Sequence, residues 1–295
     1  MKTRSARTTH RTALRQQCEE TDTTEFRCIY IDGRRIRVGV KRGHGTPLLV
    51  CNGVGASLEL LEPFTTSLSD VETIVFDIPG VGGSARGLLP YTVQGLARLT
   101  ARMLDALGYD CVDVLGLSWG GALAQQFARS FPKRCRRLIL AATTPGVTMV
   151  PASLGVLSRL AHSRRYRDAD HFRRIAAKIY GGNVRRDTTL IDRHIAHLRP
   201  PDLLGYLYQQ LAFCSWSSLL WLHRLPQQTL VLAGRDDPLV PTINADILAF
   251  LIPRARLHFV DDGHLFLLSP SQPALPVIRS FLAAPCQRDE GVSKL

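Results

Sequence analysis

Three side chains of the sequence have the types and the spacing that nucleophilic catalysis needs. Ser118 lies in Gly116-Leu-Ser-Trp-Gly120, which follows the apolar run Val112–Leu115 and precedes a segment of helical composition. A serine at such a strand–turn–helix junction is held at the apex of a sharp turn, at the positive end of the helix. Glycines on either side let neighbouring backbone pass without a Cβ clash. The pattern predicts a nucleophilic serine, although a glycine-rich strand end with an incidental serine would read the same way.

Two later segments favour catalysis. Asp237 follows the apolar run Thr229–Gly234, and His264 follows the run Leu257–Val260. The chain order Ser118, Asp237, His264 is the order of α/β-hydrolase triads, in which each member stands just after a strand. We expect Ser118 to attack the substrate, His264 to act as general base, and Asp237 to orient the histidine. The neighbouring Asp236 is an alternative acid at this stage, whereas Asp261 and Asp262 are expected to shape the histidine loop.

A fourth segment is predicted to hold the developing oxyanion. Asn52-Gly53-Val54-Gly55 ends the short apolar strand Pro47–Cys51. In this fold, the loop after that strand and the residue after the nucleophile donate their backbone N–H groups to the oxyanion. We therefore expect Val54 and Trp119 to form the oxyanion hole and take Asn52 as a candidate substrate contact. A plain glycine turn is the alternative interpretation.

The elements needed to position these residues alternate along the chain. Strands are predicted at 27–31, 36–40, 47–51, 73–77, 112–115, 138–142, 229–234 and 257–260, and helices at 93–107, 122–131, 243–251 and 273–282. Such alternation predicts an α/β-hydrolase fold, with a mostly parallel eight-stranded sheet and helices on both faces. The core is assigned to residues 25–144 and 227–284, with a disordered basic tail at 1–24 and a flexible tail at 285–295.

The alternation lapses between residues 145 and 226. Helical segments are predicted there at 154–161, 170–180, 188–198 and 203–222, and we interpret the region as an inserted helical cap over the carboxyl ends of the strands. Residues 203–222 carry no charge and have membrane-spanning length, but their glutamines and serines favour a cap helix over a transmembrane segment. Its aromatic residues either pack in the core or line an acyl pocket; as candidate substrate contacts we take Tyr206, Phe213, Trp216 and Trp221.

Composition restricts the remaining possibilities. The formal net charge is +12, and residues 145–226 contribute +7 of it, from 12 Lys and Arg against 5 Asp. A basic surface suits nucleic acid or an anionic particle, but it is equally a solvated arginine-rich exterior; without a zinc-finger, KH or RNP pattern, we expect no nucleic-acid partner. Seven cysteines without a Cys-x-x-Cys pair, and no apolar run in residues 1–20, indicate a cytoplasmic protein with Cys51 and Cys111 in the core.

No cofactor or metal is expected. The glycines 80, 82 and 83 lack the third glycine and the following helix of a dinucleotide-binding loop, so they are interpreted as a loop at the rim of the active site. His194 and His197 lie one helical turn apart, but the sequence offers no third metal ligand beside them.

Four longer motifs resemble one family. They are similar to motifs of the intracellular medium-chain-length poly(3-hydroxyalkanoate) depolymerases of bacteria. The four motifs are PGVGGS at 79–84, SWGGALAQQFA at 118–128, IYGG at 179–182 and DDGHLFL at 261–267. The likeness covers residues 25–284, and Asn52-Gly53 in place of His-Gly fits it; residues 1–24 extend beyond the family's usual start. It implies cleavage of the storage polyester at the granule surface, and the family's Gly-x-x-Asp spacing from Gly234 selects Asp237 as the acid.

The resemblance leaves other functions open. The same three side chains would serve a carboxylesterase or lipase acting on small or medium-chain esters, and an inactive hydrolase fold would serve as a non-catalytic granule protein. A dehalogenase is disfavoured, because its nucleophile would be an aspartate where this sequence has Ser118.

Overall fold

The computed structural model describes residues 23–161, 168–187, 190–192 and 202–285. Its centre is an eight-stranded sheet with the order β1-β2-β4-β3-β5-β6-β7-β8. Strand β2 runs antiparallel to both of its neighbours, and every pair from β4 to β8 is parallel. The strands are β1 (Thr24–Ile31), β2 (Arg34–Lys41), β3 (His44–Cys51), β4 (Val71–Phe76), β5 (Val112–Leu117), β6 (Cys135–Ala141), β7 (Gln228–Gly234) and β8 (Ala255–Val260).

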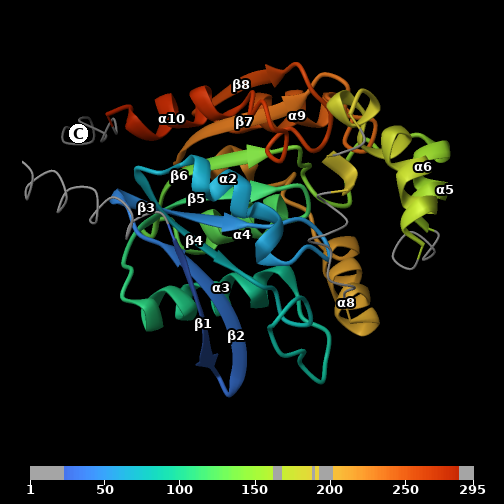
Figure 1. Ribbon diagram of the computed structural model, residues 1–295. Coiled ribbons are helices and arrows are strands. Elements are labelled where there is room, and N and C mark those ends of the chain that lie inside the picture. Colours follow the sequence, from blue (N-terminus) through green and yellow to red (C-terminus); the bar gives the residue numbers. More distant parts are fainter. Residues whose placement is uncertain (1–22, 162–167, 188–189, 193–201, 286–295) are drawn as a thin grey trace, which may run out of the picture.

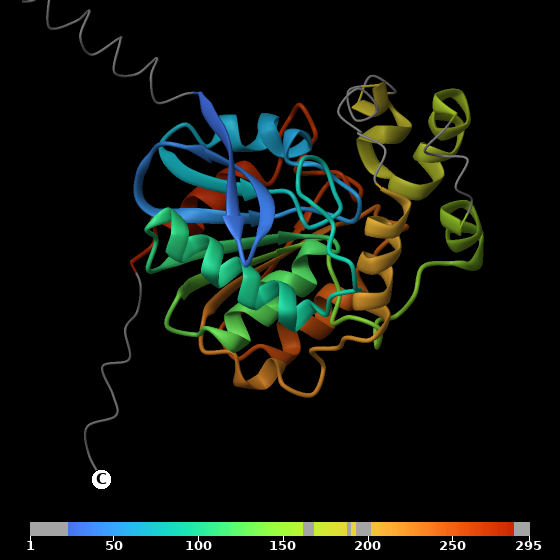
Figure 2. The same cartoon turned by 90° about the horizontal axis from the view of Figure 1, so that it is seen from below.

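Helices cover both faces of this sheet (Figures 1 and 2). One face packs on α3 (Val93–Leu107), α4 (Gly120–Ser130) and α9 (Ile243–Leu251), and the other on η1 (Leu58–Leu61), α2 (Glu62–Ser67) and α10 (Leu275–Ala283). Strand β3 shows why both faces are apolar: its successive residues alternate between the two cores, with Leu48 and Val50 in one and Leu49 and Cys51 in the other. The predicted fold class is thereby confirmed.

The segment between β6 and β7, residues 142–227, contains α5 (Leu154–Ala161), α6 (Ala169–Tyr180), η3 (Gly182–Arg185), α8 (Leu203–Cys214) and η4 (Leu222–Arg224). We call it the insertion. Its described residues form no strand beyond one isolated bridge, between Gly146 and Ser217. Figures 1 and 2 place α5, α6 and α8 together at one end of the sheet, where the parallel strands point.

One helix of the insertion is shorter than predicted. The uncharged run 203–222 is helical only to Cys214, because Trp216–Ser218 then pair with the chain at Pro145–Val147. The run is therefore not one continuous helix, and several of its leucines are exposed although it carries no charge. The expected helix 188–198 and the two expected tails fall largely outside the described residues, as do His194 and His197. Within the described ranges, no helix is both long and apolar enough to cross a membrane.

The two cysteines that were expected in the core differ in burial. Cys51 is buried in the core, and burial raises the pKa of its thiol to about 12. Cys111 is exposed at the start of β5, so its assignment to the core was wrong. The short helical region η1–α2 was not predicted, because its six-residue helix is too brief for a clear apolar stripe.

Candidate active site

Ser118 occupies a strained turn between β5 and α4. Its φ is +53°, which is unusual for a residue with a side chain. Such backbone costs of order 1–3 kcal/mol and persists only where the surroundings fix it. Here α4 begins against the end of β3: a Cβ at Gly120 would lie 2.1 Å from the carbonyl oxygen of Cys51. The bare backbone of Gly120 therefore lets the helix approach the strand and presents the Ser118 side chain at the sheet's carboxyl edge.

The structure brings the three predicted polar side chains together. His264 Nε2 lies 3.1 Å from Ser118 Oγ, and His264 Nδ1 lies 2.8 Å from Asp237 Oδ2. His264 and Asp237 are 4% and 7% exposed, so this chain of hydrogen bonds is shielded from water. The other carboxylate oxygen of Asp237 accepts hydrogen bonds of 2.9 Å from the backbone N–H groups of Leu239 and Val240. The carboxylate is thus fixed in direction as well as position.

The neighbouring Asp236 points elsewhere. It accepts a hydrogen bond from Gly182 N–H at 2.8 Å and pairs with Arg185 at 3.1 Å, and its side chain is 47% exposed. Of the two adjacent aspartates, only Asp237 contacts His264 among the interactions described.

The insertion holds the histidine loop directly. The backbone N–H of His264 donates to the carbonyl of Tyr180 at 2.7 Å, and the Tyr180 ring stacks on the imidazole with 6.0 Å between centroids. Asn183 binds the buried carboxylate of Asp262 twice, through its backbone N–H at 2.7 Å and its side-chain amide at 2.9 Å. The same amide donates to Ser269 at 3.0 Å. Segment 180–183 therefore fixes both sides of the loop that carries His264.

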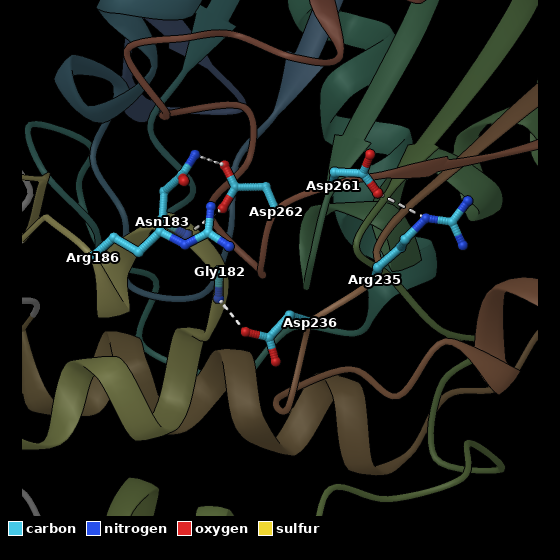
Figure 3. A pocket seen from close by; sticks show the side chains of 7 residues that line it. All are labelled: Gly182, Asn183, Arg186, Arg235, Asp236, Asp261 and Asp262. Carbon is cyan, nitrogen blue, oxygen red and sulfur yellow. Dashed lines mark hydrogen bonds and ion pairs between the residues drawn. The ribbon is translucent and has the colours of Figure 1, made fainter.

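A cavity of 320 Å³ lies beside part of this network. Figure 3 shows the side chains that line it, including the contact of Asn183 with Asp262. Asp262 and Asn183 meet on one side, Gly182 meets Asp236 below them, and the exposed pair of Arg235 and Asp261 lies apart. The expected loop-shaping role thus falls to Asp262, which is 4% exposed, whereas Asp261 pairs on the surface. Among the described residues, no group of His, Cys, Asp and Glu is arranged to hold a metal ion.

The predicted oxyanion loop lies against the nucleophile. A Cβ at Gly53 would come within 3.8 Å of Ser118 Cβ. Within the part of the chain that the structure describes, no hydrogen bond uses the backbone N–H of Val54 or of Trp119. The Asn52 side chain is only 2% exposed and spans the loop, donating to Ser57 O and accepting from Gly53 N–H, each at 2.8 Å.

The aromatic candidates of the insertion separate into two groups. Trp216 and Trp221 pack edge to face at 6.0 Å and join the core on the α3–α4 side, with the Trp216 indole donating to Gln126 at 2.8 Å. For these two, the structure supports core packing, one of the alternatives that the sequence left open. Phe213 is half-buried against the same core, and Tyr206 is half-buried with its hydroxyl accepting from Gln210 at 2.7 Å.

The glycine loop at 78–83, which the sequence predicts at the rim of the active site, contacts the insertion. Asp77, at the end of β4, accepts hydrogen bonds from the backbone N–H groups of Leu58 and Gly83, at 2.8 and 2.7 Å. Burial raises the pKa of the Asp77 carboxyl, while these bonds and Arg37 oppose the shift. The loop 78–83 that it fixes contacts α8 at Gly80.

Residues 46–270 match the family described as alpha/beta hydrolase fold. The chain belongs to this family. A hydrolase of Pseudomonas aeruginosa with a solved structure aligns with a TM-score of 0.73 at 25% identity, over 89% of this chain and 99% of that one. An esterase of Exiguobacterium antarcticum aligns with a TM-score of 0.76 at 19% identity, over 89% of this chain and all of that one, which shows the shared fold.

A further relative in the alpha/beta hydrolase family shares more of its sequence with this chain than these two structures do. The chain is 51% identical over 266 residues to a poly(3-hydroxyalkanoate) depolymerase of Ectopseudomonas oleovorans. The match covers 89% of this chain and 94% of that protein. The resemblance to the depolymerase family inferred from sequence motifs is confirmed.

Sequence reasoning missed the residues of the insertion that contact the site, chiefly Tyr180 and Asn183. The Gly-Gly pair at 181–182 was visible as part of a family motif, but Gly182 contacts Asp236, 54 positions away, and Asn183 contacts Asp262, 79 positions away. No local periodicity carries such a signal.

Proposed function

We propose that this protein is a serine hydrolase that cleaves ester bonds of medium-chain-length poly(3-hydroxyalkanoate) and releases 3-hydroxyalkanoic acids. The observation that supports the chemistry is the continuous hydrogen-bonded chain from Ser118 through His264 to Asp237. Support for the substrate comes from the 51% identical depolymerase, whose match spans nearly the whole of both proteins.

The proposed acylation uses this hydrogen-bonded chain. Ser118 Oγ attacks the ester carbonyl carbon while His264 Nε2, 3.1 Å away, accepts the hydroxyl proton. Asp237 fixes the imidazole orientation and stabilises the imidazolium that forms. The carbonyl oxygen becomes an oxyanion, to which the backbone N–H groups of Val54 and Trp119 donate. As the tetrahedral intermediate collapses, His264 returns the proton to the departing alkoxide, and the acyl group remains on Ser118.

Deacylation repeats the sequence with water. His264 takes a proton from a water molecule, which attacks the acyl carbon, and the proton then passes to Ser118 Oγ as the new acid leaves. The protein's site of action is proposed to be the cytoplasm, at the surface of the polyester granule. Because the substrate is insoluble, the polyester would have to contact the insertion, which lies over the strand ends, before it reaches Ser118.

The test compares wild type with Ser118→Ala on two substrates: amorphous medium-chain polyester granules and soluble p-nitrophenyl octanoate. We expect wild type to release hydroxy acids from granules, and the variant to lose at least about 10³-fold in rate on both substrates. Matching circular dichroism spectra would show that the variant folds. Serine-dependent activity on the soluble ester alone would contradict the polyester substrate and favour a carboxylesterase, and no serine-dependent activity on either would favour a non-catalytic role.

A further inference from the structure

Helix α8 of the insertion carries one residue into the neighbourhood of both predicted oxyanion donors. Gln209 is fully buried. Its side-chain Oε1 accepts a hydrogen bond of 2.8 Å from the backbone N–H of Gly55, the residue after Val54. Its backbone carbonyl accepts a hydrogen bond of 3.0 Å from the indole of Trp119, the residue after the nucleophile. Gln209 thus joins the two segments that flank Ser118.

The fit of α8 explains how Gln209 reaches this position. Gly205 lies one turn earlier on the same face of the helix, and a Cβ there would stand 2.2 Å from the carbonyl oxygen of Gly80. Two glycine backbones in contact therefore let α8 lie directly on the loop 78–83. This close approach places Gln209 within hydrogen-bonding distance of Gly55.

The orientation of the Gln209 amide is set by its partner. A backbone N–H is only a donor, so the side-chain atom that faces Gly55 must be the oxygen. The nitrogen, Nε2, consequently points away from Gly55. It is buried, and it has no hydrogen-bond partner among the described residues.

Buried amide nitrogens are almost always paired in folded proteins, so each exception calls for an explanation. Here the unpaired donor belongs to a side chain that already contacts the oxyanion loop. An ester offers only acceptors to a protein, namely its carbonyl and alkoxy oxygens. The chemistry of the unpaired group therefore matches the substrate class proposed above.

We propose that Gln209 is a substrate-contacting residue of the hydrolase: Oε1 holds the loop 53–55 against the nucleophile turn, and the free Nε2–H donates to an oxygen of the bound ester. The inference rests on the proposed ester hydrolysis at Ser118. It assigns to the insertion a direct part in the chemistry, in addition to covering the strand ends.

Two substitutions separate the two functions of the amide. Gln209→Glu keeps an acceptor for Gly55 N–H but replaces the donor by an oxygen. Gln209→Met keeps the length of the side chain and removes both. The matched control is Gln210→Met on the same helix, because Gln210 is half-buried and its amide contacts Tyr206 rather than either loop.

The first measurement is kcat and KM for soluble p-nitrophenyl octanoate at pH 8. Loss of one oxyanion-hole donor typically reduces kcat about 10²–10³-fold, and we expect reductions of about 10²-fold in both Gln209 variants, with KM changed much less. The control should stay within about twofold of wild type. A Gln209→Glu variant with wild-type kcat would overturn the donor role.

The second measurement is hydrogen exchange of the Gly55 amide, which needs no turnover. We expect faster exchange in Gln209→Met and unchanged exchange in Gln209→Glu, because only the former loses the acceptor. Wild-type exchange in the Met variant would overturn the positioning role. Both readouts are independent of the polyester: wild type that is active on the soluble ester but inert on granules would contradict the proposed substrate and leave the comparison of Gln209 variants intact.

Discussion

Adjacent aspartates at the end of β7 differ in what they contact. Asp237 is buried against His264, whereas Asp236 bonds to the insertion and is half exposed. We expect Asp237→Asn to lower kcat by about 10⁴-fold, because an amide at this position favours the wrong imidazole tautomer. Asp236→Asn should lower kcat by less than tenfold. Steady-state kinetics on a soluble ester would compare them, and a greater loss from Asp236→Asn would contradict the assignment of the acid.

Among single residues, the sequence predicts the catalytic ones that lie in a short recognisable motif. Gly-x-Ser-x-Gly and the spacing from Gly234 to Asp237 are visible in short stretches, and the structure brings the residues they point to within hydrogen-bonding distance of His264. Gln209 has no such signature. Its partner Gly55 is 154 positions away, and a glutamine in an uncharged helix reads as an ordinary core-edge residue.

The end of α6 and the short helix η3, residues 180–185, position the histidine loop, and Asn183 makes the main polar contacts. We expect Asn183→Asp to reduce kcat by about 10–10²-fold with little change in KM, since two carboxylates would repel across the contact with Asp262 and shift His264. Combining Asn183→Asp with Asp262→Asn places an amide opposite a carboxylate again, with the two groups exchanged. The double variant should therefore recover most of the lost kcat. Steady-state kinetics of the single and double variants would test this; failure of the double variant to recover would contradict a positioning role.

Arg185 provides the matched control from the same segment. Its ion pair with Asp236 joins side chains that are 50% and 47% exposed, and exposed pairs contribute only about 0–1 kcal/mol. Arg185→Gln should therefore leave kcat within about twofold of wild type and the melting temperature nearly unchanged.

The contact of α8 with the loop 78–83 leads to a second prediction, which concerns stability and activity. Alanine is favoured over glycine in a helix by about 1 kcal/mol, but a Cβ at Gly205 would meet backbone that has no side-chain freedom to yield. We expect Gly205→Ala to lower both the melting temperature and kcat, because α8 and Gln209 would move away together. Leu207→Ala, at an exposed position of the same helix, is the control for both measurements. An unchanged kcat in Gly205→Ala would contradict the coupling.

The strands and the longer covering helices are predictable because each has its own apolar pattern, whereas the short η1–α2 region has none. The insertion is harder to predict, since its segments fold against the core instead of following an internal pattern. Residues 215–222 illustrate this: the helix ends at Cys214 and Trp216 and Ser218 are buried beyond it, an arrangement that the uncharged sequence cannot distinguish from a longer helix.

At the scale of the whole molecule, a buried ionic cluster lies at the end of the sheet opposite to the catalytic site. Asp113, near the amino end of β5, is buried beside Arg136 and Arg137. Burial raises the pKa of the Asp113 carboxyl, and the two arginines only partly oppose that shift. The folded protein therefore binds this proton more tightly than the unfolded chain does, so stability is lost as the pH rises from the ordinary carboxyl pKa through the folded value.

This sign gives a measurable prediction. The free energy of unfolding of wild type, minus that of Asp113→Asn, should fall as the pH rises through that interval, because asparagine does not titrate. Urea unfolding between pH 4 and pH 7 would measure the difference. A difference that rises with pH would mean that the arginines outweigh burial. kcat at pH 8 and 25 °C should change less than twofold in the variant, since the site lies at the other end of the strands.

Within its described residues, the insertion contacts the catalytic loops through Tyr180–Asn183 on the histidine side and through Gln209 on the oxyanion side, and Thr143 at its start donates to the carbonyl of Ser118. It follows that it is not an interchangeable module. A chimera that replaced the insertion, residues 142–227, with the corresponding part of a distant alpha/beta hydrolase would introduce a new pocket and at the same time remove the hydrogen bonds that align the triad. Altering the substrate range of this protein is therefore best approached by changing single side chains between Asn183 and Gln209.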